Sequence, residues 1–326
     1  MSRKLSISKA IGEALHEEMA RDENVIIMGE DMGKMGNVFG ITVGFQEEFG
    51  EHRVYDTPIS ESGFCGMAVG AAMRGIRPVA ELMYDDFITV AADPVLNQAA
   101  KMRYMTGGQA KVPLVYRMPM GTGRRNAGQH SQCLESLFCH MPGLKVVAPS
   151  SAKDAKGLLK TAIRDDDPII FLEHKLLYAK KEEIPEGEYT IPLGVADVKR
   201  EGTDITVITW SRQVYFALEA AEELAKEGVS VEVLDLRTLV PLDWDAVVKS
   251  VSKTHNVVVV SEEVKRGSYA AEISAQIVEE LFDELDAPVE RVCGLNTVSP
   301  FSPTLEDVNF PHPADIVKAV KHVLNR

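Results

Sequence analysis

Residues 56–87 read DTPISESGFCGMAVGAAMRGIRPVAELMYDDF, and this stretch decides the fold. A turn that bears Glu61 leads into a predicted helix, and the apolar run 78–83 predicts a strand directly after it. Small residues recur along the helix, at Gly66, Ala68, Gly70 and Ala72. Small side chains let another backbone approach closely, which suits either a helix of another subunit or the packing of this helix on its own sheet. The stretch is typical of one helix-and-strand step in an α/β fold.

The same alternation of amphipathic stretches and short β-branched runs extends from one end of the chain to the other. A first helix is predicted over 7–20, where Ile11, Leu15 and Met19 share one face. Strands are predicted at 25–28, 53–56, 78–83, 112–118, 145–148 and 168–172. Helices that alternate with strands in this way pack on mainly parallel sheets, so the predicted fold class is α/β.

The periodicity fails between about 175 and 195, where KLLYAKKEEIPEGEYTIPLG mixes charges with proline and glycine as an extended connector does. We therefore predict a first domain over 1–192, with the connector from about 175, and a second domain over 193–326. Strands are predicted in the second domain at 204–209, 229–236, 256–261 and 289–294, with helices at 213–227 and 269–285. A chain of 326 residues is long enough for two cores.

The charge balance excludes some classes of partner. The chain has 49 acidic and 35 basic side chains, a net charge of −14, which repels nucleic acid phosphates and anionic membrane surfaces. No apolar run approaches the roughly 20 residues of a membrane-spanning helix. From Ile191 onward there are 13 basic and 23 acidic side chains. A basic protein partner could dock on this part, or the acidity serves only solubility.

The four cysteines, Cys65, Cys133, Cys139 and Cys293, form no CxxC pair. The first nine residues also lack the apolar core of a signal peptide, so we expect a cytoplasmic protein with reduced thiols. Cys133, Cys139 and His140 lie close together in the sequence and could form part of a metal site. No second cluster of ligands accompanies them, and small buried cysteines are common.

The chain resembles a known family through several blocks besides 56–87. These blocks are AAKMRYMTGGQAKVPLVYRMP, GQHSQCLES, PGLKVVAPSSAKDAKGLLKTAIRDDDPIIFLEHKLLY and VEVLDLRTLVPLD. Together they are similar to the beta subunits of pyruvate, branched-chain 2-oxo acid and acetoin dehydrogenases over nearly the whole chain. The resemblance implies two doubly wound α/β domains, a transketolase-like pyrimidine-binding domain followed by a transketolase C-terminal domain.

Glu61, in the S-E-x-G-F element, has two interpretations. A carboxylate at a helix N-terminus is favoured by the exposed amides and the macrodipole, so on spacing alone Glu61 is a capping acid. The resemblance implies instead that Glu61 hydrogen-bonds a ring nitrogen of the aminopyrimidine of thiamin diphosphate. A proton shared there favours the imino form of the exocyclic amine, which then takes the proton from the thiazolium carbon.

Three further residues are assigned to the cofactor region by the resemblance, and one to the transfer chemistry. Phe87, in MYDDF, corresponds to an aromatic that stacks on the pyrimidine, although ordinary core packing would use the same side chain. Glu30, in MGEDMG, and Ile59 resemble residues that line this region. His130, in AGQHSQ, matches an active-site histidine that stabilises cofactor-bound intermediates and their transfer to a lipoyl group, work suited to an imidazole that titrates near neutral pH.

The chain lacks a motif that would hold the diphosphate. Thiamin-diphosphate enzymes bind Mg2+ and the diphosphate through a GDG element followed about 25 to 30 residues later by Asn. No GDG occurs here, and Gly121, Gly123 and Gly128 fit neither the Rossmann nor the Walker spacing. The resemblance implies that an alpha subunit holds the Mg2+ diphosphate, in a heterotetramer of two alpha and two beta chains with the cofactor at each interface.

The resemblance also implies a structural K+ ion near TAIRDDDP, residues 161–168. The implied ligands are main-chain carbonyls of Leu114, Ala162, Ile163, Asp165 and Asp167. Three adjacent acids are equally typical of a solvated helix end. The second domain is expected to make subunit contacts and to dock on a dihydrolipoyl acyltransferase core, whose basic docking domain would complement its acidity.

The choice among candidate substrates rests on the similarity of short sequence motifs and not on the chemistry of particular residues. AELMYDDF, PVLNQAAKMRYM and VSPFSPTLEDVNFP are closer to acetoin and pyruvate dehydrogenase beta chains than to branched-chain ones, with acetoin ahead. The compact GEDMGKMGNVFG, where some acetoin chains have an insertion, keeps pyruvate open. The predicted function is an oxidoreductase that, with its alpha subunit, cleaves acetoin or oxidatively decarboxylates pyruvate and passes the acyl group to a lipoyl-acyltransferase. A branched-chain enzyme, a non-catalytic interface scaffold and a self-sufficient transketolase-like enzyme are the alternatives.

Overall fold

The computed structural model describes residues 2–325, which fold into two compact units. Unit 1 contains the residues up to Met120 and Leu137–Leu193, and unit 2 contains Gly121–Ser136 and the residues from Gly194 onward. The segment Gly121–Ser136, which lies within the predicted first domain, therefore clusters with the second unit. The short helix α5 (Glu135–Cys139) spans the point at which the chain returns to unit 1.

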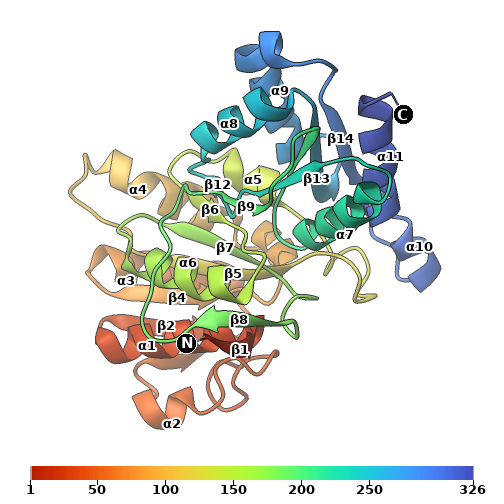
Figure 1. The fold of residues 1–326 in the computed structure, drawn as a ribbon. Helices are drawn as coiled ribbons and strands as arrows, with labels where there is room; N and C mark the ends of the chain where they lie inside the picture. The colour runs from red at the N-terminus through yellow and green to blue at the C-terminus, as the bar shows by residue number, and fades with distance from the viewer. Residues whose placement is uncertain (1, 326) are drawn as a thin grey trace. The chain divides into compact units, whose positions relative to one another are not determined.

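Unit 1 is built on parallel strands in the order β6-β7-β5-β4-β2-β3 (Figure 1). Their bounds are β2 (Val25–Gly29), β3 (Val54–Asp56), β4 (Arg77–Glu81), β5 (Val115–Met120), β6 (Lys145–Val147) and β7 (Ile169–His174). Nearly every residue of the central strands is buried, because parallel strands are covered by helices on both faces. The predicted α/β class is confirmed.

The helices of unit 1 begin where the sequence supplies suitable caps. Ser6 accepts a hydrogen bond from the Lys9 amide at the start of α1, and Ser151 accepts one from Asp154 at the start of α6. The bounds are α1 (Ile7–Arg21), α2 (Phe45–Phe49), α3 (Glu61–Met73), the 3-10 helix η1 (Asp85–Thr89), the π-helix η2 (Asp93–Ala99), α4 (Ala100–Met105) and α6 (Ala152–Arg164).

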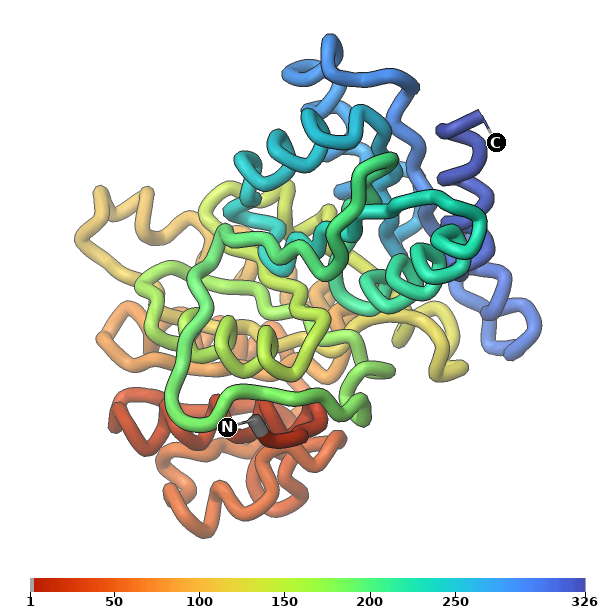
Figure 2. Tube along the Cα trace, in the orientation of Figure 1, coloured from red at the N-terminus to blue at the C-terminus, as the bar shows by residue number. Residues whose placement is uncertain are grey.

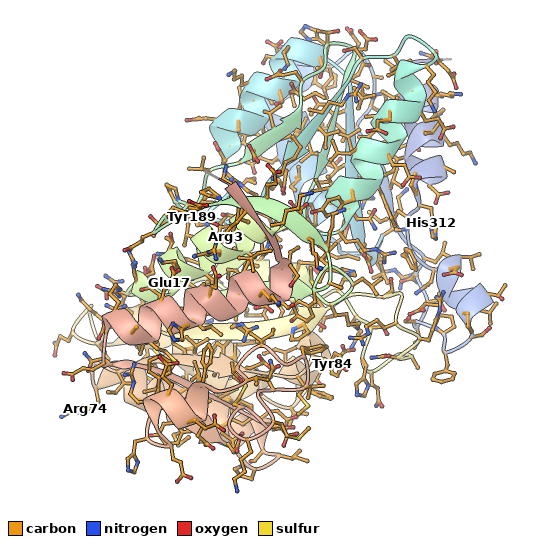
Figure 3. All side chains as sticks on the ribbon, turned by 60° about the horizontal axis from the view of Figure 1, so that its bottom comes forward. Arg3, Glu17, Arg74, Tyr84, Tyr189 and His312 are labelled. Carbon is orange, nitrogen blue, oxygen red and sulfur yellow. The ribbon has the colours of Figure 1, made fainter. Side chains whose placement is uncertain are left out.

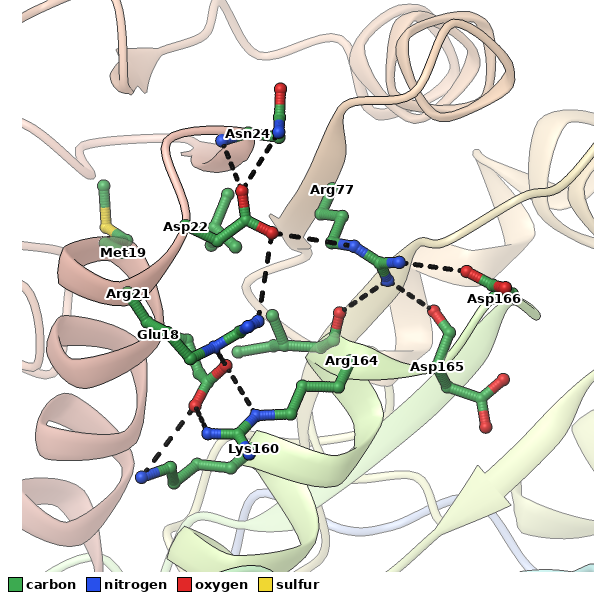
Figure 4. A network of polar contacts seen from close by, with 12 residues as sticks. Glu18, Met19, Arg21, Asp22, Asn24, Arg77, Lys160, Arg164, Asp165 and Asp166 are labelled. Atoms are coloured by element: carbon green, nitrogen blue, oxygen red, sulfur yellow. Dashed lines mark hydrogen bonds and ion pairs between the residues drawn. The ribbon is translucent and has the colours of Figure 1, made fainter. Parts of the chain in front are cut away.

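Charged side chains join α1 to α6. The fully buried Glu18 of α1 accepts hydrogen bonds from Arg164 of α6 at 2.6 and 2.9 Å and from Arg21 at 2.7 Å (Figure 4). Glu17, labelled in Figure 3, accepts bonds from the buried amines of Lys156 and Lys160, each at 2.6 Å. Buried lysines require such partners because an unpaired charge away from water is costly.

The connector runs beside the start of the chain. Figure 2 shows the N-terminal strand β1 (Ser2–Ser6) next to β8 (Lys181–Pro185), and the two strands pair antiparallel. After β8 the chain has no regular structure until β9 (Asp197–Arg200) in unit 2. The loss of periodicity after 175 thus corresponds to an extended segment that contains one short edge strand.

Unit 2 has a sheet in the order β14-β13-β10-β11-β9, in which only β9 is antiparallel to its neighbour. Figure 1 labels β9, β13 and β14 of this sheet. Helices α7 and α11 share one apolar core with β10, β11 and β13, while α8 and α9 contact β10 and β13. The bounds are β10 (Ile205–Thr209), α7 (Gln213–Ala225), β11 (Val231–Asp235), β12 (Thr238–Val240), α8 (Trp244–Thr254), β13 (Val257–Val264), α9 (Tyr269–Leu281), η3 (Phe282–Glu284), β14 (Glu290–Gly294), α10 (Pro303–Asp307) and α11 (Pro313–Val323).

Between residues 2 and 325, no helix is both long enough and apolar enough to span a bilayer.

Candidate active site

The carboxyl ends of the parallel strands of unit 1 meet at one edge. Gly29 at the end of β2 is in register with Asp56 at the end of β3 and with Glu81 at the end of β4. Glu30 follows β2 directly, so its side chain starts from this edge. Ligands of open α/β sheets bind at the carboxyl ends of the strands. This edge is therefore the place to look for a site in unit 1.

Glu61 is the first residue of α3 and lies close to Glu30. Their side chains are 7% and 9% exposed, and neither carboxylate accepts a protein hydrogen bond within residues 2–325. Burial raises the pKa of Glu30, and the neighbouring charge of Glu61 raises it further. The helix has Ser60 at its N-cap, with no side-chain cap bond. Glu61 thus does not cap α3 through a hydrogen bond, and its carboxylate is left to bind something else.

Apolar groups accompany these acids. Ile59, two residues before Glu61, is largely exposed, as is Val90 at the end of η1. Phe87 lies within η1, which follows β4, and is only half-buried. Its ring meets that of Tyr84 edge to face, with centroids 5.9 Å apart; Figure 3 labels Tyr84. Phe87 therefore does not belong to the closed core, and one part of its ring can contact a ligand.

A buried ion cluster supports the same edge. Arg117 of β5 is fully buried and donates to Glu173 of β7 at 2.7 and 2.8 Å and to Glu81 at 2.7 Å. The Asn37 amide donates to Glu81, and the Tyr178 hydroxyl donates to Glu173. Burial disfavours the charge on Arg117, but the two carboxylates outweigh burial and raise its pKa. The cluster fixes the ends of β4, β5 and β7 relative to one another.

His130 lies in unit 2, in a loop whose backbone amides donate hydrogen bonds to buried carboxylates. Glu262 accepts hydrogen bonds from the amide and hydroxyl of Thr122 at 2.7 and 2.5 Å. Glu306 accepts from the amides of Gly123 and Arg125 at 2.9 and 3.2 Å. Carboxylates thus already occupy the amides of the glycine-rich stretch, so it is not a phosphate loop. His130 itself is half-buried, and its amide donates to the carbonyl of Ala127 at 3.3 Å.

A carboxyl group at the end of this loop carries a displaced pKa. Glu135 is buried, and its Oε1 accepts a hydrogen bond from the Trp210 indole at 3.0 Å, whereas its Oε2 has no hydrogen-bond partner among residues 2–325. Burial raises the pKa of Glu135 well above its ordinary value, and the charge of nearby Glu263 raises it further. The folded state therefore retains a proton that the unfolded chain would lose.

This proton makes the stability of the fold depend on pH. For a carboxyl whose folded pKa is raised, the stabilising contribution is complete below the unfolded pKa of about 4.3 and is lost as the pH rises through the folded value. Glu135→Gln removes the ionisation and keeps an acceptor for Trp210. We expect a higher melting temperature than the wild type at pH 8 and nearly the same one at pH 5, measured by circular dichroism. A difference that does not vary with pH would contradict the displaced pKa.

Comparison with known proteins decides the family. Residues 3–181 match the family described as "Transketolase, pyrimidine binding domain", and residues 194–316 match "Transketolase, C-terminal domain". The beta subunit of acetoin:2,6-dichlorophenolindophenol oxidoreductase from Cupriavidus necator is 50% identical, over 99% of this chain and 98% of that protein. The beta subunit of the pyruvate dehydrogenase E1 component from Rickettsia felis is 46% identical, over 98% of each chain.

The chain belongs to the beta subunits of the acetoin and 2-oxo acid dehydrogenases.

A solved structure supports the fold of this family. A chain titled "Split gene transketolase, inactive beta4 tetramer" superposes with a TM-score of 0.79 over 98% of both chains, at 21% identity. The sequence resemblance and the transketolase-like two-domain fold are thus confirmed. Of the residues that the resemblance assigns, the structure brings Glu30 and Glu61 together at the strand edge of unit 1. It places Ile59 beside Glu61, Phe87 after a neighbouring strand, and His130 in unit 2.

Four of the five carbonyls that the resemblance assigns to K+, those of Leu114, Ala162, Ile163 and Asp165, accept protein hydrogen bonds in unit 1. Arg77 donates to the carbonyls of Ile163 at 3.1 Å and Asp165 at 2.8 Å (Figure 4). The Leu114 carbonyl accepts from the Ile169 amide. A guanidinium thus faces two of the oxygens that the ion would use.

The neighbouring carboxylates also face cations. Asp165 and Asp167 both pair with Lys145, and Asp167 also pairs with Arg103. The set fits a K+ ion only if Arg77 moves or shares its oxygens. The ion stays a prediction, which a higher melting temperature in KCl than in NaCl would support.

The cysteines give no metal site. In the part of the chain that the structure describes, no three His, Cys, Asp or Glu side chains lie as a metal-binding group. Cys65 is buried, and Cys133, Cys139 and Cys293 are half-buried; none of the four is in a disulfide. Sequence reasoning missed the ion cluster around Arg117, although a signal was present. Charged residues at or near the ends of apolar strands, in AELM, YRMP and FLEH, are unusual unless they are paired.

Proposed function

We propose that this chain is the beta subunit of a thiamin-diphosphate-dependent acetoin dehydrogenase, in which Glu61 binds the cofactor's aminopyrimidine. One observation supports this most: the Glu61 carboxylate is nearly buried, lies at the start of α3 and has no protein partner within residues 2–325. Buried carboxylates are normally hydrogen-bonded. The cofactor's ring nitrogen supplies the missing partner, the flat face of Phe87 suits a planar ring, and Ile59 adds apolar surface beside it.

When bound, thiamin diphosphate supplies a carbon nucleophile and an electron sink for cleavage of a bond next to a carbonyl. Glu61 would hydrogen-bond the pyrimidine nitrogen of the bound cofactor. Burial, and then the neighbouring charge of Glu61, raise the pKa of Glu30 in the same corner of the site. His130 is assigned the hydrogen-bonding and proton-transfer steps that accompany passage of the acyl group to a lipoyl group.

Phe87→Ala tests the assigned contact with the cofactor. Because Phe87 is half-buried, the loss of packing should be modest, whereas the loss of its ring face should act on the bound pyrimidine. We expect thiamin diphosphate affinity to fall at least about tenfold, which corresponds to 1.4 kcal/mol, with a small change in melting temperature. The measurement is cofactor titration by tryptophan fluorescence with thermal unfolding in parallel. A large loss of stability with unchanged affinity would place Phe87 in the core instead.

His130→Ala separates transfer from cofactor binding. The loop around His130 is held by Glu262 and Glu306 through backbone amides, so the substitution should leave it in place. We expect acetylation of a free lipoyl domain to fall at least about 100-fold, within the range of general acid–base contributions. Cofactor affinity should stay the same. Unchanged lipoyl acetylation would refute the role of His130.

The proposed assembly contains two alpha and two beta chains, with Mg2+ and the diphosphate held by alpha. The exposed face of α3 supports a subunit contact. A Cβ added to Gly70 would meet nothing within 4 Å, and one on Gly66 would meet only Pro94 at 3.8 Å, whereas Ala68 and Ala72 are buried within unit 1. The acidic second domain is proposed to dock on the basic peripheral domain of a dihydrolipoyl acyltransferase. Docking that does not weaken with added salt would count against this.

The substrate proposal rests on the acetoin relative being somewhat more similar than the pyruvate relative. It is tested by dye-linked turnover of the chain copurified with its alpha subunit, with thiamin diphosphate and Mg2+, on acetoin, pyruvate and a branched-chain 2-oxo acid. Preference for acetoin supports the proposal, and preference for either acid replaces it with that activity. No turnover of any of the three, together with no cofactor binding, would favour a non-catalytic scaffold.

A further inference from the structure

Four aromatic rings form a row near the carboxyl ends of the unit 1 strands. Phe87 of η1 meets Tyr84 edge to face, with ring centroids 5.9 Å apart. Tyr84 also meets Phe39 at 6.5 Å, and Phe39 meets Tyr178 at 4.9 Å. The rings come from the segment after β4, from the loop between β2 and α2 and from the turn after β7, so the tertiary fold brings them together. The row ends at the ring that the proposed function places against the cofactor.

The other end of this aromatic row is fixed to the buried ion cluster. The Tyr178 hydroxyl donates to Glu173 at 2.7 Å. The backbone amide of Phe39 donates to the side-chain oxygen of Asn37 at 2.8 Å, and the Asn37 amide donates to Glu81 at 2.8 and 2.9 Å. These two rings therefore have fixed positions at their end of the row.

A buried cation lies over the Tyr84 ring. Lys175 follows β7 directly and is 3% exposed, and its Nζ is 5.1 Å from the centroid of that ring. An ammonium group is attracted to the negative face of an aromatic ring, and more strongly where water is excluded. Because β7 is a fully buried strand, the ammonium that follows it restrains the orientation of Tyr84.

The orientation of the Phe87 ring depends on its neighbours. Phe87 is half-buried on a short 3-10 helix, a conformation with poorer hydrogen-bond geometry than an α-helix. A half-buried side chain can occupy more than one staggered rotamer. The edge-to-face contact with Tyr84 favours one of them, because aromatic pairs have preferred geometries. A ring that is already oriented loses less conformational freedom when a ligand stacks on it.

We infer that Tyr84 is a positioning residue of the cofactor site, whose ring holds Phe87 in the orientation that receives the cofactor's pyrimidine. The inference rests on the proposed contact between Phe87 and thiamin diphosphate. It goes beyond that contact, since Tyr84 acts through Phe87 and does not itself touch the cofactor. The role belongs to the ring of Tyr84 and not to its hydroxyl. Lys175 acts one step further away, through its charge on the Tyr84 ring.

Ring order is measured in the full chain copurified with its alpha subunit and freed of cofactor. Para-fluorophenylalanine in place of Phe87 gives a fluorine NMR signal that reports how many rotamers the ring samples. We expect one narrow signal with the wild-type Tyr84 and with Tyr84→Phe, and a broadened or split signal in Tyr84→Leu. Tyr104→Leu, at a tyrosine of unit 1 that is 91% exposed, is the matched control and should leave the signal unchanged. A signal as narrow in Tyr84→Leu as in the wild type would overturn the inference.

Thiamin diphosphate affinity of the same variants, without the fluorine label, is the second measurement. We expect Tyr84→Leu to weaken binding about fivefold, the effect of one aromatic pair, and Lys175→Met about threefold, the effect of one cation over a ring. Tyr84→Phe should bind as the wild type does. The double variant Tyr84→Leu/Phe87→Ala should bind no more weakly than Phe87→Ala alone, because Tyr84 acts through Phe87. Additive losses would mean that Tyr84 contacts the cofactor itself, and would overturn the inference.

The two proposals fail in distinguishable ways. Unchanged affinity in Phe87→Ala would refute the proposed cofactor contact and, with it, this inference. Weaker binding in Phe87→Ala together with wild-type binding in a folded Tyr84→Leu would refute this inference alone. Melting temperatures identify a variant that does not fold. If Tyr84→Leu is such a variant, an unchanged signal and affinity in Lys175→Met would overturn the inference.

Discussion

Glu61→Gln is expected to lower turnover of the assembled enzyme at least about 100-fold, within the range of a general acid–base contribution. Glutamine has nearly the same shape and can still contact the pyrimidine nitrogen, but it cannot share and exchange a proton with it. The Glu61 side chain makes no hydrogen bond to the protein within residues 2–325, so the substitution breaks no native contact. The fold should survive, and the effect should fall on turnover rather than on stability.

The measurement combines dye-linked turnover, cofactor titration and thermal unfolding of the same preparation. Glu30→Gln is the matched control, because Glu30 is a buried carboxyl beside Glu61 whose pKa is raised by burial and by that charge. We expect Glu30→Gln to lose less turnover than Glu61→Gln, because only Glu61 is assigned the hydrogen bond to the pyrimidine nitrogen. Near-normal turnover in Glu61→Gln would remove this residue from the chemistry and leave the N-terminal charge of α3 as its only role.

Arg117→Met is expected to have the largest effect on stability, a loss of about 3–5 kcal/mol in the free energy of unfolding. Methionine fills a similar volume, but it leaves Glu81 and Glu173 buried without the guanidinium that pairs with both. Asn37 and Tyr178 would still donate to these carboxylates. Burial already raises the pKa of Glu81 in the intact protein, so the variant should bind an additional proton on folding.

Urea unfolding of the full chain, followed at pH 6 and pH 8, measures this loss. The variant should be less destabilised at pH 6, because a carboxyl with a raised folded pKa stabilises the fold while it is protonated and loses that contribution as the pH rises. Arg103→Met is the matched control. Its partly exposed pair with Asp167 is screened by water, so its loss should lower the free energy of unfolding only slightly. A loss in Arg117→Met no larger than in this control would mean that the cluster does not hold the strand ends.

The local features of the candidate site, such as where helices begin, could largely be predicted from the sequence. The small residues and the acid of 56–87 predicted a helix that begins at Glu61, and α3 does begin there. The first helix was predicted over 7–20 and is found at Ile7–Arg21. Such features depend on neighbours within a few positions, whose periodicity and capping are encoded locally. The assignments of Glu30, Ile59, Phe87 and His130 came from the resemblance of sequence segments to the family, and they stay predictions.

Contacts between segments that lie far apart in the sequence could not be predicted in the same way. The segment Gly121–Ser136 follows β5 of unit 1 directly, yet its amides bind Glu262 and Glu306 of unit 2. No local sequence pattern predicts a hydrogen-bond partner that lies 140 or 183 residues further along the chain. Likewise the Arg117 cluster depends on the register of three parallel strands, which sets which side chains meet at the strand ends.

The sequence by itself determined the α/β class, the family and the position of Glu61 at the start of a helix, because periodicity, helix capping and sequence motifs are properties of contiguous residues. The tertiary structure alone decided that Glu61 and Glu30 share a corner in which neither carboxylate accepts a hydrogen bond from residues 2–325, and that Arg117 pairs with two carboxylates. Those relations arise when strand pairing and loop packing bring distant segments together, and burial then determines which polar atoms remain unsatisfied.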